Sequence, residues 1–224
     1  MNSTIHQNLQ RVLSSLPNGV RLVAVSKFHP IESLREAYES GQRIFGESKV
    51  QEMTQKYEAL PKDIEWHFIG HLQTNKVKYI VPYVTLIHGV DSFKLLSEIN
   101  RQGEKNGRVI SCLLQMHVAR EETKFGFSLN ECRQMLAEEE WKKFTHVKIC
   151  GIMGMASNTD DENLVRDEFK TLHDFFCEIQ QKHFSTDEDF KELSMGMSHD
   201  YLWAVEEGAT LVRVGSMIFG VRNY

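Results

Sequence analysis

The sequence predicts an α/β protein, a single (β/α)8 barrel of the TIM type with an extra helix at its N-terminus. Short apolar segments alternate with longer amphipathic segments along the chain, which is typical of repeated βα units. The apolar segments are eight in number, enough to close such a barrel, and the 224 residues have the length of one barrel. We therefore expect residues 1–224 to form one domain. An open doubly wound sheet, with about five or six strands, is the alternative.

The extra helix is predicted over the first sixteen residues. Residues 17–19 (Pro-Asn-Gly) end it, because proline and glycine interrupt helices. The apolar residues that recur at helical spacing are Ile5, Leu9, Val12, Leu13 and Leu16.

The predicted strands are apolar at successive positions, as expected for parallel strands that helices cover on both faces. Their ranges are 21–26, 43–46, 65–70, 84–90, 108–118, 147–153, 193–198 (with its loop) and 211–214.

Amphipathic segments between these strands predict the surrounding helices, several of which end at a glycine such as Gly41 or Gly208. Their ranges are 31–40, 47–60, 74–81, 92–106, 129–144, 160–183 and 199–207.

Composition excludes several classes of function. A net charge of −5 gives no basic surface for nucleic acid. The polar first ten residues are no secretory signal, and no apolar run approaches the ~18 residues that span a bilayer. Four widely spaced cysteines form neither a metal pattern nor a disulfide framework, so we expect a cytoplasmic protein without a metal site. The mixed-charge helix surfaces favour a monomer.

Lys27 follows the first predicted strand, where reactive groups of barrel proteins gather. A lysine amine whose pKa is lowered by burial can form a Schiff base with a carbonyl carbon. The alternative is a solvated lysine in the loop after the strand.

The loops after the last two strands suggest a phosphate site. Residues 194–198 (Ser-Met-Gly-Met-Ser) and 215–216 (Gly-Ser) offer backbone amides and hydroxyls ahead of helices. Barrels often bind phosphate at these two strands, although ordinary turn residues are the alternative. Arg213 lies between two valines of the last strand, and strand alternation would direct it into the barrel. A lysine, a phosphate site and an inward arginine together suggest pyridoxal 5′-phosphate (PLP).

Motifs along nearly the whole chain resemble the pyridoxal phosphate homeostasis protein family. They are Val25-Ser26-Lys27, Phe45-Gly46-Glu47, Trp66-His67-Phe68-Ile69-Gly70, Leu72-Gln73-Thr74-Asn75-Lys76, Lys124-Phe125-Gly126, Leu193-Ser194-Met195-Gly196-Met197-Ser198 and Val212-Arg213-Val214-Gly215-Ser216.

The resemblance implies a barrel like the N-terminal domain of alanine racemase, with PLP held as an aldimine on Lys27. It implies Arg213 beside the pyridine nitrogen. The residues that it implies around the phosphate are Ser194, Met195, Ser198, Gly215 and Ser216.

Some positions depart from the family pattern. Ser48 follows Phe-Gly-Glu where the family commonly has asparagine, and His117 stands where asparagine is common. His71 matches one of two common forms, and the segment around Met153 differs in detail. We expect Ser48, His71 and Met153 to contact the cofactor.

The residues favour a PLP carrier in vitamin B6 homeostasis over an amino-acid racemase or decarboxylase. An arginine keeps its proton, so a pyridine nitrogen beside Arg213 stays unprotonated and withdraws electrons poorly. The chain ends at Tyr224, without the second domain that carries alanine racemase's other base, and nothing in the sequence places Tyr201 or Tyr224 over the ring. We expect PLP-dependent apoenzymes as acceptors, with Lys76 or Lys124 as candidates for releasing the aldimine.

A Schiff-base aldolase acting on phosphorylated sugars is a third possibility. Its general base would have to be Glu47 or Asp91, each of which could equally cap a helix.

Overall fold

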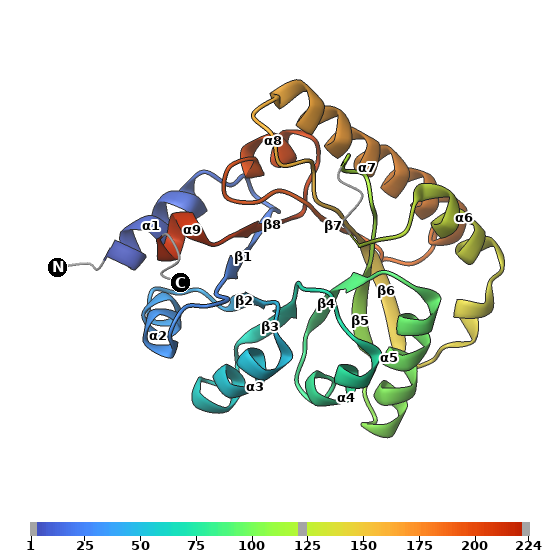
Figure 1. The fold of residues 1–224 in the computed structure, drawn as a ribbon, viewed down its shortest axis with the longest axis horizontal. Helices are drawn as coiled ribbons and strands as arrows, with labels where there is room; N and C mark the ends of the chain where they lie inside the picture. Colours follow the sequence, from blue (N-terminus) through green and yellow to red (C-terminus); the bar gives the residue numbers. More distant parts are fainter. Residues whose placement is uncertain (1–3, 121–124, 221–224) are drawn as a thin grey trace.

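Eight parallel strands close into a barrel in which each strand pairs with the next along the chain and the eighth pairs with the first (Figure 1). The computed structural model describes residues 4–120 and 125–220. This architecture confirms the predicted TIM barrel. The strands are β1 (Arg21–Val25), β2 (Ile44–Glu47), β3 (Glu65–Phe68), β4 (Leu86–Val90), β5 (Ile110–Gln115), β6 (Val147–Met153), β7 (Glu192–Ser194) and β8 (Leu211–Val214).

Helices surround the barrel, and the extra N-terminal helix α1 packs beside α9 near the other end of the chain (Figure 1). The side-chain amide of Asn8 in α1 donates to the Ile218 carbonyl in α9 at 3.3 Å. The helices are α1 (Thr4–Ser14), α2 (Ile31–Glu39), α3 (Val50–Ala59), α4 (Val77–Ile80), α5 (Phe93–Lys105), α6 (Leu129–Ala137), α7 (Glu162–His183), α8 (Tyr201–Glu206) and α9 (Ser216–Phe219), with 3₁₀ turns η1 (Thr74–Lys76) and η2 (Glu140–Lys143).

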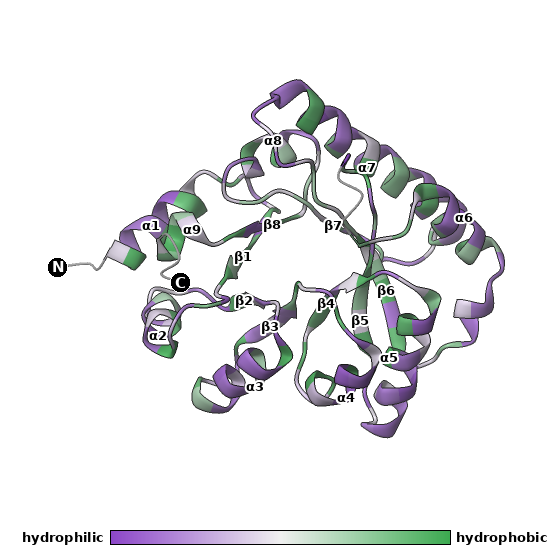
Figure 2. Cartoon of the chain, in the orientation of Figure 1, coloured by the Kyte–Doolittle hydropathy of each residue, from purple (hydrophilic) through white to green (hydrophobic). Residues whose placement is uncertain are grey.

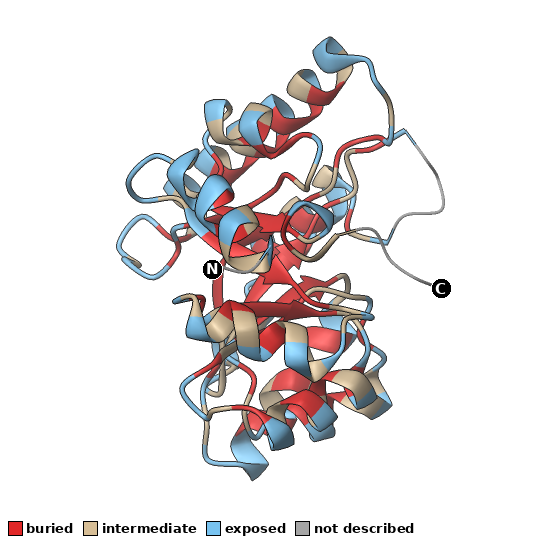
Figure 3. Ribbon diagram, turned by 90° about the vertical axis from the view of Figure 1, so that its left-hand side faces the viewer, coloured by how far each residue is buried: buried red, intermediate tan, exposed pale blue. Residues whose placement is uncertain are grey.

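The strands carry side chains into two separate apolar regions. Their outward residues pack under the helices in a large core that includes Phe45, Trp66 and Phe169. Figure 2 shows many apolar residues along the strands and polar residues on the outer helix faces. In Figure 3 the strands form the buried centre of the molecule. The inward residues form a smaller cluster inside the barrel, made of Val23, Leu86, Leu113, Cys150, Met153 and Leu211. This division tells which side chains can reach the barrel mouth.

Two predicted boundaries were wrong for identifiable reasons. The predicted helix 47–60 begins later, because Glu47 is the buried last residue of β2 and pairs inside the protein. The predicted helix 129–144 is interrupted, because Glu139 adopts a left-handed conformation with φ 56° and divides α6 from η2. The helical turn α9 was not predicted.

A glycine is required where β6 passes β7. Gly151 has φ 149°, and a Cβ atom there would lie 1.8 Å from the Glu192 carbonyl oxygen. The register of β6 against β5 shifts between Cys112 and Leu113, next to this position. Two residues further along β6, Met153 lies in the interior cluster.

No helix within residues 4–120 and 125–220 is long and apolar enough to cross a bilayer. The four cysteines are all unpaired, and Cys112, Cys132 and Cys150 are buried. Among the described residues, no group of three or more histidine, cysteine or acidic side chains could hold a metal ion.

Candidate functional site at the barrel mouth

The carboxyl ends of the strands bring most of the predicted site residues to one end of the barrel. Strands β1 and β8 are neighbours, with Val23 paired to Arg213 and Ala24 to Val214. Val23 of β1 belongs to the interior cluster, and Lys27 follows two residues after Val25, the last residue of that strand. Lys27 is half-buried. Lys27 therefore follows the strand that pairs with the strand of Arg213.

Arg213 is a buried cation inside the barrel, and its side chain binds two oxygen acceptors. Nη1 donates to Ser194 Oγ at 2.7 Å, and Nη2 donates to the Gly154 carbonyl at 3.0 Å. Burial lowers the pKa of Arg213 to about 10, although Asp200 favours its charged form. The guanidinium thus remains protonated at neutral pH.

A chain of hydrogen bonds continues from Arg213 across the barrel. Ser194 Oγ lies 2.9 Å from His88 Nδ1, and His88 Nε2 lies 3.0 Å from His67 Nδ1. Burial lowers the pKa of His67 to about 3 and that of His88 well below its usual value, so both rings are neutral at pH 7. We call these four residues the Arg213 chain.

The Arg213 chain has a defined direction. Arginine can only donate, so Ser194 Oγ accepts from Arg213. The buried Ser194 hydroxyl needs an acceptor for its own hydrogen, and His88 Nδ1 is that acceptor. His88 then carries its proton on Nε2 and donates it to His67 Nδ1. This assignment of tautomers follows from the hydrogen bonding and orients the serine lone pair toward Arg213.

The loops after β7 and β8 meet next to the end of β1. The Gly215 N–H donates to Ser198 Oγ at 3.2 Å, which joins the two loops. A Cβ atom at Gly215 would lie 2.9 Å from the Val25 carbonyl oxygen, so this backbone must approach β1 closely. Ser216 is exposed and opens the turn α9, whose first amides have no acceptor within the helix. Hydroxyls and amides of this kind suit a phosphate.

Ser194 and Met195 differ from the expectation that both line the phosphate site. Ser194 is fully buried, and its hydroxyl binds Arg213 and His88 inside the barrel. The Met195 side chain packs in the outer core, while its N–H donates to the Leu211 carbonyl. Sequence adjacency to Ser198 could not reveal these directions.

Lys27 lies in a tight turn that the sequence did not predict. The His29 N–H donates to the Ser26 carbonyl at 3.1 Å, which closes the turn over Lys27 and Phe28. Phe28 has φ 68°, a left-handed conformation that non-glycine residues rarely adopt. Such strained residues are typical of functional positions.

Ser48 and His71 line a cavity of about 260 Å³ beside the mouth, together with Lys49 and Lys76. His71 Nδ1 lies 2.9 Å from Asp91, and its ring stacks on Phe125 at 3.9 Å between centroids. Both residues therefore lie at the β2–β3 side of the mouth, away from the loops after β7 and β8.

Glu47 and Asp91 are not helix caps. Glu47 is buried and pairs with Lys56, while α3 begins after Lys49 without a side-chain cap. Ser92, next to Asp91, caps α5 instead by accepting from the Leu95 N–H.

Two other predicted residues adjoin the loop after β7: Met153 pairs with Ser194 at the end of that strand, and the Tyr201 N–H donates to the Met197 carbonyl at 2.9 Å. Met153 lies inside the barrel, and Tyr201 Oη is 2.9 Å from Ser15 Oγ near α1. Lys124 and Tyr224 fall outside the described residues.

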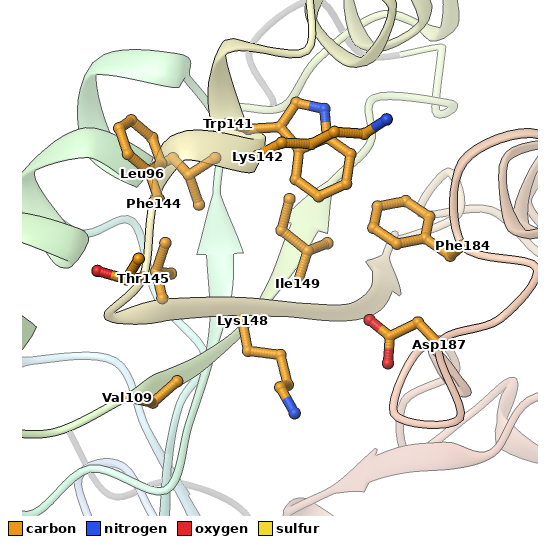
Figure 4. Close-up of a pocket in the computed structure, with 11 residues that line it drawn as sticks. Leu96, Val109, Trp141, Lys142, Phe144, Thr145, Lys148, Ile149, Phe184 and Asp187 are labelled. Atoms are coloured by element: carbon orange, nitrogen blue, oxygen red, sulfur yellow. The ribbon is translucent and has the colours of Figure 1, made fainter.

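A second cavity lies at the opposite end of the barrel, where β5 and β6 begin. It measures about 380 Å³ and is lined by Trp141, Phe144 and Phe184, with Lys148 and Asp187 at its edge (Figure 4). None of the predicted site residues lines it.

The chain matches a known family over nearly its whole length. A family model described as the N-terminal domain of alanine racemase matches residues 2–223. The pyridoxal phosphate homeostasis protein of Aquifex aeolicus is 41% identical over 208 residues, covering 92% of this chain and 89% of that protein. The protein of the same name from Schizosaccharomyces pombe is 38% identical over 229 residues, covering 98% and 94%.

Solved structures agree with these matches. PipY of Synechococcus elongatus with PLP bound is 37% identical, with a TM-score of 0.87 over 96% of this chain and all of that one. An alanine racemase from Clostridium difficile is 12% identical with a TM-score of 0.78, covering 96% of this chain and 56% of that one, a likeness of fold alone.

Proposed function

Because the chain belongs to the pyridoxal phosphate homeostasis proteins, a family built on the N-terminal barrel of alanine racemase, we propose that it binds PLP and takes part in PLP homeostasis. Relatives from a bacterium and a yeast carry that name over nearly the whole of this chain. A homologue with 37% identity is known with PLP bound.

The placement of Arg213 is the observation that carries the proposal. It provides a buried cation inside the barrel, one strand from Lys27. The other residues fit the same ligand: Lys27 supplies an amine for an aldehyde, and Ser198 and Ser216 supply hydroxyls for a phosphate beside Gly215. An amine, a phosphate site and a partner for the pyridine nitrogen are the features that bind PLP in proteins.

In this proposal Lys27 holds the cofactor as an aldimine, and Arg213 faces its pyridine nitrogen. When bound, PLP supplies a conjugated ring that can accept electrons from a substrate carbon. Ser194 and Gly154 hold Arg213 in place, and Ser48, His71 and Met153 are proposed contacts along the ring side. Met195 contributes to the site by packing in the outer core, because its N–H already donates to the Leu211 carbonyl.

We propose that the protein carries the cofactor without robust catalysis. Arg213, with a pKa of about 10, keeps its proton at neutral pH and leaves the facing nitrogen unprotonated, which makes the ring a poor acceptor of electrons. Tyr201, one candidate for a second base, is bonded to Ser15 instead. A cytoplasmic monomer that delivers PLP to apoenzymes completes the proposal.

The visible spectrum of the purified protein tests the covalent link. We expect a yellow band that borohydride bleaches and that is absent from Lys27→Ala, with Lys94→Ala as a control because Lys94 is exposed on α5. A colourless wild type that added PLP does not reconstitute would contradict PLP binding. It would reopen the aldolase alternative, which needs no conjugated aldimine.

Turnover separates the carrier from the racemase or decarboxylase alternative. Amino-acid racemisation or decarboxylation at about 1 per second or faster would contradict the carrier proposal. Recovery of activity in a PLP-dependent apoenzyme mixed with the loaded protein, faster than with the same concentration of free PLP, would support delivery by direct contact.

A further inference from the structure

Three charged residues beneath the Lys27 turn take no part in the function proposed above. Glu47 ends β2, and Glu52 and Lys56 lie one helical turn apart on α3. The side chains of Glu47 and Lys56 are 0% and 5% exposed. We call these three residues the Lys56 network.

The Lys56 network bonds the backbone on both sides of Lys27. Lys56 Nζ donates to the Ser26 carbonyl at 2.8 Å, and the Phe28 N–H donates to Glu52 Oε1 at 2.6 Å. Ser26 Oγ also donates to Glu47 Oε1 at 2.6 Å. The residues before and after Lys27 are thus tied to β2 and α3.

The Lys56 ammonium has its three N–H donors matched by three acceptors. Besides the Ser26 carbonyl, it donates to Glu47 Oε1 and to Glu52 Oε1, both at 2.7 Å. Lys56 is therefore fully engaged as a cation, which distinguishes it from an amine that reacts with aldehydes.

Buried ion pairs contribute little net stability, because desolvation of the charges offsets their attraction. Glu47 illustrates this: burial raises its pKa to about 7 despite Lys56, and its Oε2 atom has no partner among the described residues. The geometric effect of the network is more specific. It holds Phe28 at φ 68°, a conformation that costs roughly 1 kcal/mol or more for a residue with a side chain.

We propose that Glu47, Glu52 and Lys56 are positioning residues that set the direction of the Lys27 amine toward an aldehyde bound in the barrel mouth. This inference rests on the proposed function. The neutral Lys27 nitrogen forms a double bond to the aldehyde carbon, the carbon–oxygen bond breaks, and the oxygen leaves as water with both amine protons. Because the turn is already fixed before the aldehyde binds, it favours formation of the bond to the aldehyde carbon. It has no such effect on noncovalent binding of the ring and phosphate.

Glu52 is the residue to change, because its side chain is 20% exposed and its loss leaves the buried Glu47–Lys56 pair intact. Glu52→Ala removes the acceptor for the Phe28 N–H, whereas Glu52→Gln keeps an amide oxygen there. Glu58→Ala, on the exposed face of the same helix, is the matched control.

Binding of two ligands separates positioning from general damage. PLP carries the aldehyde, and pyridoxine 5′-phosphate has the same ring and phosphate with an alcohol in its place. We expect the Kd for PLP to rise about ten-fold in Glu52→Ala, while the Kd for pyridoxine 5′-phosphate changes less than two-fold. Glu52→Gln should recover most of the PLP affinity, and Glu58→Ala should match the wild type.

Amide hydrogen exchange of the protein without cofactor gives a second readout. We expect the Phe28 N–H to exchange about ten-fold faster in Glu52→Ala and at the wild-type rate in Glu58→Ala. Equal losses for both ligands would show that Glu52 supports the fold generally, and unchanged affinity would show that the turn needs no support; either result overturns the inference. If wild type and Lys27→Ala bind both ligands equally, the proposed covalent link fails instead, and Phe28 exchange still decides whether Glu52 fixes the turn.

Discussion

The two sides of the barrel mouth hold their main cations in different ways. On the β8 side, Arg213 is supported by a serine and two neutral histidines that cross the barrel interior. On the β1 side, the backbone around Lys27 is supported by the charged Lys56 network. The first arrangement bonds one charged group to neutral partners, with Asp200 favouring its charge. The second fixes the backbone on both sides of Lys27.

The two networks also differ in how they respond to pH. Burial keeps His67 and His88 neutral far below pH 7, so the Arg213 chain has one protonation state under ordinary conditions. Glu47 has a pKa of about 7, so the Lys56 network changes charge near neutral pH. The difference teaches that a buried cation can be stabilised by neutral dipoles, whereas a strained turn is held here by charges that can titrate.

The largest effect should come from removing Lys56. Lys56→Ala leaves Glu47 and Glu52 without their cation and deletes a buried side chain, and we expect a loss of about 3 kcal/mol in the free energy of unfolding. Urea denaturation at pH 7.5 measures this loss, and Lys94→Ala should stay within about 0.5 kcal/mol of the wild type. Equal small losses in both variants would refute the charged support of the turn.

The next effect concerns the pH dependence of Glu47. The folded pKa of about 7 lies above the ordinary 4.5, so the folded protein holds this proton more tightly than the unfolded chain. Its contribution to stability therefore increases as pH falls from 7 to 4.5, by about 3 kcal/mol in all. In Glu47→Gln this contribution should vanish, so the stability difference from wild type should change across that window. A difference that stays constant with pH would contradict the raised pKa.

His67 should show the opposite sign. Its folded pKa of about 3 lies below the ordinary 6.5, so the unfolded chain binds the proton first and stability falls as pH drops below 6.5. Between pH 6.5 and 5 the loss from this residue should be about 2 kcal/mol. His67→Gln should lose that much less over the same interval, as measured by thermal or urea unfolding. Identical pH profiles for the two proteins would show that His67 is not held neutral.

The smallest effect distinguishes strain from support at the Lys27 turn. Phe28→Gly removes the penalty for φ 68°, together with a ring that is 44% exposed and lies 4.6 Å from the Lys49 ammonium. We expect a gain of about 0.5–1 kcal/mol in stability together with weaker PLP binding, because glycine also frees other conformations of the turn. A destabilised variant would mean that packing of the Phe28 ring outweighs the backbone penalty.

Much of the fold could be predicted because parallel strands have a clear sequence pattern. The predicted range of β6 is the observed Val147–Met153, and that of β8 is Leu211–Val214. The break at Glu139 could not be predicted, because a glutamate in a left-handed conformation carries no local signal. The buried Glu47 was assigned to a helix for a similar reason, since charged residues usually indicate exposed helical surface.

Less of the candidate site could be predicted. The apolar neighbours of Lys27 and Arg213 predicted a strand before the lysine and a strand around the arginine, as observed for β1 and β8. The direction of Ser194 depends on contacts with β4 and β8, distant in sequence, and Lys56 looks like any helix-surface lysine. His67 was part of a family motif and His88 lay in a predicted strand, but nothing in the sequence indicated that the two rings bond to each other.

The Lys56 network comes entirely from residues 47–56, within one strand-to-helix unit of the barrel. The three charged side chains that bond the turn after β1 thus lie in one contiguous piece of sequence. Protein engineers could transplant that piece as a module. It would be moved, together with the Ser26–His29 turn, into the adjacent first and second units of another TIM barrel. There it would hold the backbone around a reactive lysine in a designed enzyme.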